Sequence, residues 1–150
     1  MIKAIDTIYD GHKFRSRLEA RWAVFFNKAR IEYRYELEGY TLPFKINYLP
    51  DFLINDPDYG WCFAEVKPTR FTAEEYFKCA MLCSESNKRV ILFEEEPFYG
   101  MTYWMIAPVA HGYCHNVTNE VWGFATAYPW YEKACEEAAL ARFEFGETPL

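Results

Sequence analysis

Two apolar segments, separated by a turn-forming stretch, limit the folds open to this chain. The first is "FKINYLPDFLIN" (residues 44–55), the second is "WCFAEVK" (residues 61–67), and "DPDYG" lies between them. Clusters of Pro and Gly of this kind typically form turns between strands. We therefore predict an antiparallel hairpin with Asp51 on the first strand and Glu65 on the second, where the two can meet if the register aligns them.

Both segments carry charged residues where a buried strand normally stays apolar. Side chains alternate across a strand, so Glu65 and Lys67 share one face while Val66 points into the opposite layer. A pair of carboxylates suits Mg²⁺ or Mn²⁺, and a neighbouring lysine can orient an attacking water or offset charge on a phosphate. Two structural alternatives stay open: Glu65 and Lys67 form a surface salt bridge, and Asp51 is a turn residue.

The order of helical and strand patterns predicts the fold class. Apolar residues recur at helical spacing from Ser16 to about Ala29, and Ser16 with Glu19 has the spacing of a capping box. Together with the hairpin, this order predicts an α/β fold, a mixed central β-sheet flanked by helices. The other predicted elements are a strand at 31–37, a helix at 72–86 capped by Thr72 with Glu75 at its third position, a buried strand at 88–93, strands at 103–108 and 121–128, and a helix at 130–143.

The composition fits one globular domain. Half of the 150 residues are apolar and a fifth are aromatic, enough for one core but not for two. Apolar runs break within about ten residues, below membrane-spanning length, and residues 1–14 lack an apolar signal core. We therefore expect a cytoplasmic protein without membrane contact. The aromatic residues gathered in 99–130 suit a core or a dimer interface, although base stacking uses the same rings.

Five cysteines, an odd number without paired spacing, fit a reducing compartment. Cys79 and Cys83 lie one helical turn apart, and "HGYCH" adds His111, Cys114 and His115. Zinc accepts ligands of these types. We prefer the alternative of buried thiols plus loop histidines, because cysteine is commonly buried and the spacing matches no common zinc module.

Charge is unevenly distributed along the chain. The net charge is −6, which alone argues against a nucleic-acid partner. Residues 1–50, however, carry nine Lys and Arg against six Asp and Glu, whereas residues 51–150 carry seven against sixteen. The basic residues cluster in "HKFRSRLEAR" (residues 12–21). Local charge therefore leaves a nucleic-acid partner open.

Four stretches, in order, resemble the motifs of the PD-(D/E)XK nuclease superfamily: "FRSRLE", "RIEYRYE", "PDF" and "EVK". The likeness is greatest to small phage and bacterial members, the junction-resolving and transposase-associated endonucleases. It covers about residues 11–95. It implies a restriction-endonuclease-like core in a single domain (1–150), with 96–150 as an aromatic-rich, acidic C-terminal extension.

The resemblance also implies roles for the residues at the motif positions. Asp51, Glu65 and the backbone carbonyl of Val66 would bind one Mg²⁺ or Mn²⁺. Glu19, from the first helix, would complete a second position or hold a metal-bound water. Lys67 would position the hydroxide for in-line attack on phosphorus, which leaves 5′-phosphate and 3′-hydroxyl ends.

Arginine and lysine near these motifs are candidates for contacts with DNA. Arg15 precedes Glu19 by four residues and shares its helix face, so it is the first candidate for a phosphate contact. Its alternative is an ion pair with Glu19. Arg17 and Lys13 are further candidates, and so is Lys78, for which Glu74 is an equally suitable partner.

The expected function is a metal-dependent DNA endonuclease in the bacterial or phage-infected host cytosol. The resemblance to small phage and bacterial members implies a phage or mobile-element enzyme that cuts branched or structured DNA during recombination. Cutting both arms of a junction needs two active sites and hence a homodimer. Two alternatives stay open: a nicking or single-strand nuclease subunit that needs a partner, and a non-catalytic, acidic interaction protein such as a phage inhibitor.

Overall fold

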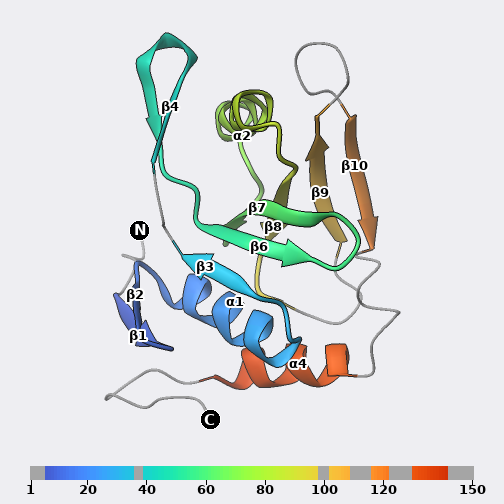
Figure 1. The fold of residues 1–150 in the computed structure, drawn as a ribbon. Coiled ribbons are helices and arrows are strands. Elements are labelled where there is room, and N and C mark those ends of the chain that lie inside the picture. The colour runs from blue at the N-terminus through green and yellow to red at the C-terminus, as the bar shows by residue number, and fades with distance from the viewer. Residues whose placement is uncertain (1–5, 36–38, 98–101, 109–115, 122–129, 142–150) are drawn as a thin grey trace.

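The fold is a β-sheet with helices on both faces, as the computed structural model in Figure 1 shows. The structure describes residues 6–35, 39–97, 102–108, 116–121 and 130–141. The elements in chain order are β1 (Thr7–Tyr9), β2 (His12–Phe14), α1 (Arg17–Lys28), β3 (Tyr33–Tyr35), β4 (Tyr40–Leu42), β5 (Ile46–Tyr48), β6 (Phe52–Asp56), β7 (Gly60–Lys67), α2 (Ala73–Ser86), β8 (Val90–Glu94), β9 (Thr102–Ala107), β10 (Asn116–Val121) and α4 (Trp130–Leu140).

Within the described residues, six strands form the central sheet in the order β10-β9-β8-β7-β6-β3. Strands β7 and β8 are parallel and are joined by α2, whereas the other neighbouring pairs are antiparallel. The sheet is therefore mixed, and the predicted α/β architecture with flanking helices is confirmed. β8 is buried along most of its length, as its continuous apolar sequence predicted.

The two faces of the sheet have separate cores. Helices α1 and α4 lie together on one face, and α2 with the β4–β5 hairpin lies on the other (Figure 1). On the α1 face, Trp22 stacks on Phe93 of β8 with 4.1 Å between ring centroids. Because side chains alternate along β6, Phe52 joins the α1 core and Leu53 packs against the α2 core.

Both central helices begin at the residues that their sequences indicate. The hydroxyl of Ser16 caps α1 by accepting from the backbone N–H of Glu19. Thr72 and Glu75 form a reciprocal capping box at the start of α2. The ends of both helices that face the site are thus fixed by their own sequences.

Some local details differ from the expectation. The extended run 44–55 forms two strands, β5 and β6, in different sheets, and β5 pairs with β4. The short β1–β2 hairpin before α1 was not predicted. The predicted strand 121–128 lies, apart from its first residue, outside the described residues, as do His111, Cys114 and His115. In the part of the chain that the structure describes, no helix is long and apolar enough to cross a membrane.

Candidate functional site

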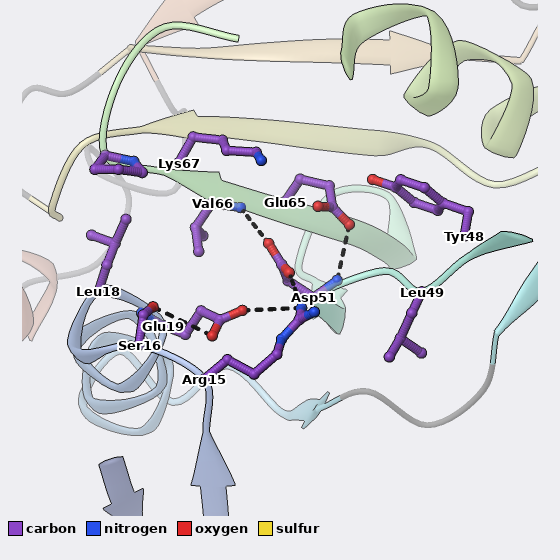
Figure 2. Close-up of a pocket in the computed structure, with 11 residues that line it drawn as sticks. Arg15, Ser16, Leu18, Glu19, Tyr48, Leu49, Asp51, Glu65, Val66 and Lys67 are labelled. Atoms are coloured by element: carbon purple, nitrogen blue, oxygen red, sulfur yellow. Dashed lines mark hydrogen bonds and ion pairs between the residues drawn. The ribbon is translucent and has the colours of Figure 1, made fainter. Parts of the chain in front are cut away.

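The β6–β7 hairpin has the register that brings the two predicted carboxylates together. Phe52 pairs with Ala64, so Asp51, one residue before β6, lies opposite Glu65. The carboxylates open into a cavity of about 770 Å³ at this end of the sheet, between α1 and the end of β5 (Figure 2). Its lining residues are Arg15, Ser16, Leu18, Glu19, Tyr48, Leu49, Asp51, Glu65, Val66, Lys67 and Pro68.

Backbone groups hold Asp51 and Glu65 in place. The N–H of Asp51 donates to Glu65 Oε1 at 2.9 Å, and the N–H of Val66 donates to Asp51 Oδ2 at 3.0 Å. Both carboxylates are buried, with 7% and 5% of their surface exposed. These hydrogen bonds fix both carboxylates at the strand ends, so that little ordering is needed when a ligand binds.

Helix α1 adds a third buried carboxylate, Glu19, and Arg15, just before the N-cap of the helix, is the cation that faces it. The Nη2 atom of Arg15 lies 3.3 Å from Glu19 Oε1 and 2.8 Å from Asp51 Oδ1. The hydroxyl of Tyr35 donates to Glu19 Oε2 at 3.1 Å and accepts from the backbone N–H of Arg15 at 3.1 Å. The Arg15–Glu19 ion pair named as an alternative is therefore present, and Arg15 also reaches Asp51.

Lys67 enters the cavity from the other side. It lies two residues beyond Glu65 on β7, and its ammonium group forms an ion pair with Glu75 at the start of α2. Partial burial lowers the pKa of Lys67, but the hydrogen bond and charge of Glu75 outweigh it and raise the pKa. Lys67 is therefore held as a cation at a fixed position.

The pKa values of the three carboxylates are raised, so that a positive ligand would stabilise their ionised forms. Burial, followed by repulsion from Asp51, raises the pKa of Glu19 to about 7. Burial and then repulsion from Glu65 raise the pKa of Asp51 above its ordinary range. Burial also raises the pKa of Glu65, although the hydrogen bond from Asp51 acts in the opposite direction. Burial and mutual repulsion therefore make ionisation of these carboxylates less favourable, and an added positive charge would favour it.

The donor set fits one Mg²⁺ or Mn²⁺ held by Asp51 and Glu65, because such ions often use two carboxylates and keep several waters. The backbone N–H and C=O of a strand residue point to the same side, and the N–H of Val66 faces Asp51. The Val66 carbonyl therefore faces the same edge as Asp51. Within the described ranges, no group of three or more His, Cys, Asp or Glu side chains is arranged to hold a metal ion.

Three of the predicted DNA contacts do not line the cavity. Lys13 is exposed and pairs with Asp6, and Lys78 pairs with Glu74 across one turn of α2. Arg17, the first residue of α1, is also absent from the lining. Of the basic residues proposed to contact DNA, the structure brings Arg15 to the carboxylates.

Three residues of the site were missed or given another role in the sequence analysis. Tyr35 was placed on a strand by its alternation, but nothing in its pattern indicated the contact with Glu19. The hydroxyl of Tyr48 lies 3.4 Å from Cys79 Sγ, next to the Glu65 side chain (Figure 2). Glu75 was predicted as a helix cap, and its ion pair with Lys67 depends on how α2 packs.

Comparisons of the chain with protein-family models, with curated proteins and with solved structures found no match. The relationship to the PD-(D/E)XK nucleases therefore stays a prediction based on the motifs.

Proposed function

We propose that this protein is a metal-dependent endonuclease of the restriction-endonuclease-like fold that hydrolyses DNA phosphodiester bonds. The observation that carries the proposal is the convergence of Asp51, Glu65 and Lys67 with Glu19 and Arg15 at one cavity. Buried carboxylates with raised pKa values beside two cationic side chains are costly to assemble, so they mark functional sites more often than structural ones.

Each side chain has a role that follows from its position. Asp51 and Glu65, with the Val66 carbonyl, would hold Mg²⁺ or Mn²⁺. Such an ion, when bound, polarises a phosphate and lowers the pKa of an attacking water. Lys67, kept protonated by Glu75, would orient that water and offset the charge that develops on the phosphate oxygens.

Arg15 and Glu19 would act on the substrate side of the cavity. The Arg15 side chain is half exposed, so a phosphate oxygen of the substrate can approach its guanidinium. Glu19 faces the same opening and would hold a water near the ion. We propose branched or structured DNA as the substrate, because the motifs are closest to those of junction-resolving and transposase-associated enzymes.

The proposal is tested by incubating the purified protein with plasmid, linear duplex, single-stranded and four-way-junction DNA in Mg²⁺, Mn²⁺ or EDTA. We expect cleavage that requires the metal and leaves 5′-phosphate ends. The Glu65→Ala, Lys67→Ala double variant is expected to be inactive. A Glu74→Gln variant, which changes an exposed carboxylate outside the cavity, should cut normally.

Absence of cleavage on all four substrates, with folded protein and metal present, would contradict the endonuclease proposal. Cleavage that appears only when a partner protein is added would point to a nuclease subunit. If an effect of the protein on the cells that express it persists in the Glu65→Ala, Lys67→Ala variant, the effect does not need catalysis. That result would point to the non-catalytic interaction protein.

A further inference from the structure

We propose that Arg15 is an internal counter-ion that competes with the divalent cation for Asp51 and Glu19, and that a substrate phosphate removes it. The idea rests on the proposed function of the site, since it concerns the same cation. Its consequence is that metal and DNA bind cooperatively and the DNA-free protein binds metal weakly.

The partners of Asp51 carry the argument. Its Oδ2 atom accepts from the backbone N–H of Val66, and its Oδ1 atom lies 2.8 Å from the guanidinium of Arg15. The N–H of Val66 belongs to a central strand and cannot move away without breaking the sheet. A cation that approaches Oδ1 therefore meets the positive charge of Arg15, and the repulsion between the two weakens its binding to that oxygen.

The Arg15 side chain is placed so that it can leave its contact with Asp51 and Glu19. It is 52% exposed, whereas the carboxylates that it contacts, Glu19 and Asp51, are almost fully buried. It belongs to the residue before the N-cap Ser16, outside the regular helix. Its backbone is held separately, by the hydrogen bond from its N–H to Tyr35. Figure 2 shows the Arg15 side chain in its contact with Asp51 and Glu19. It can leave these carboxylates while its backbone stays in place.

Charge decides when the exchange is favourable. One guanidinium faces two carboxylates in a buried setting, where an unpaired carboxylate is costly. Removing Arg15 is therefore unfavourable unless a cation replaces it and the guanidinium finds another anion. A phosphodiester supplies that anion, since guanidinium groups bind phosphate oxygens well. Two ligands that each favour the same displaced state of Arg15 must strengthen one another, by the reciprocity of coupled binding.

The test is isothermal titration calorimetry of Mn²⁺ into DNA-free protein. We expect Arg15→Gln to bind Mn²⁺ about tenfold more tightly than the wild-type chain, within the usual range of coupling between sites. Arg15→Lys, which keeps the charge but loses the planar fork, should tighten binding by a smaller factor. Lys28→Gln removes the same charge from the far end of α1, where Lys28 pairs with Glu137, and should leave the affinity unchanged.

A second titration measures the coupling itself. A short phosphorothioate oligonucleotide should tighten Mn²⁺ binding to the wild-type protein by a larger factor than it tightens binding to Arg15→Gln. Circular dichroism establishes that each variant is folded. If Arg15→Gln does not fold, Arg15→Lys gives the same comparison with the charge retained.

The outcomes separate this inference from the proposed function. Equal or weaker Mn²⁺ binding by folded Arg15→Gln would overturn the role of Arg15, while loss of binding in Glu65→Gln would still support the metal site. An equal gain in Lys28→Gln would overturn it as well, because the effect would then reflect net charge. No Mn²⁺ binding by any folded variant, either alone or with the oligonucleotide, would overturn both.

Discussion

The two sides of the cavity neutralise charge in different ways. On the α1 side, one guanidinium, Arg15, faces two buried carboxylates, Glu19 and Asp51. On the α2 side, one ammonium, Lys67, pairs with one carboxylate, Glu75, which also belongs to a helix cap. The first side is short of positive charge, whereas the second is balanced.

This difference indicates which cation can move. Glu75 is tied to the N–H of Thr72 through its other oxygen, so Lys67 is connected to a fixed helix end. Arg15 has a half-exposed side chain and contacts carboxylates that a metal could also use. We therefore expect Lys67 to act from a constant position and Arg15 to change partners.

The largest effect is expected at Glu65, which lies between the two sides. Glu65→Gln removes a metal ligand but keeps the size of the side chain and an oxygen that can accept from the N–H of Asp51. Cleavage should fall at least about a thousandfold, because charge stabilisation at the phosphate is lost. Single-turnover cleavage assays measure the loss.

The metal-free Glu65→Gln protein should be at least as stable as the wild-type chain, since a buried charge has been removed. Thermal unfolding followed by circular dichroism gives this control. Full cleavage by Glu65→Gln would show that the chemistry does not pass through the carboxylate pair. A large fall in the unfolding temperature would mean that Glu65 has a structural role instead.

A smaller effect is expected when the ion pair of the α2 side, Lys67–Glu75, is removed. Glu75→Gln removes the charge that raises the pKa of Lys67. Losing a residue that orients a catalytic group typically costs about 10- to 100-fold in activity, and we expect kcat to fall by about tenfold. The alkaline limit of the pH–rate profile should also move to lower pH, because Lys67 loses its proton more easily.

Thr72→Ala is the matched control for Glu75→Gln. It removes the hydroxyl that accepts from the N–H of Glu75 and so weakens the cap of α2, but it leaves the Lys67–Glu75 pair in place. If the two variants lose activity equally and neither moves the pH profile, Glu75 acts only on helix stability. The predicted contrast between the two sides would then be wrong.

The sequence was sufficient for the parts of this site that local periodicity determines. The alternation along β7 separated Glu65 and Lys67 from Val66, and the turn residues between the strands predicted the hairpin. The register that places Asp51 opposite Glu65 came from the structure. The caps Ser16 and Thr72 were also predictable, because capping depends on neighbouring residues.

The contacts that were missed depend on packing between distant segments. Tyr35 meets Glu19 across 16 residues, and Arg15 meets Asp51 across 36. Periodicity gives the face of a strand or helix but not the neighbour that the face will meet. The β1–β2 hairpin was missed because its three-residue strands are too short to show a period. Residues 46–48 were predicted as extended, but their pairing with β4 depends on how the chain packs and was not predicted.

The charge deficit of the α1 side makes stability depend on pH in a defined direction. The folded state raises the pKa of Glu19 from about 4.5 to about 7, so the folded protein holds more protons than the unfolded chain between these values. Stability from this group is complete below the lower value and is lost as pH rises through the upper one. The increase in unfolding temperature on adding Mn²⁺ should therefore be larger at pH 8 than at pH 5.5.

Differential scanning fluorimetry at both pH values, with and without Mn²⁺, measures this difference. Glu19→Gln is the matched variant, because it cannot ionise, and its Mn²⁺ shift should depend less on pH. An equal shift at both pH values in the wild-type protein would mean that no carboxylate of the cavity changes its protonation when the metal binds.

The smallest effect is expected at Lys78, a second lysine of the α2 side that lies outside the cavity lining. Lys78 pairs with Glu74, whose side chain is mostly exposed, and surface pairs of this kind contribute about 0.3–0.5 kcal/mol. Lys78→Gln should therefore leave cleavage and DNA affinity within about twofold of the wild-type values. Fluorescence anisotropy with a labelled junction measures the affinity. A loss of DNA affinity several times larger than twofold would indicate that DNA binds along the outer surface of α2. The α2 side would then contribute to DNA binding through Lys78 as well as through the cavity.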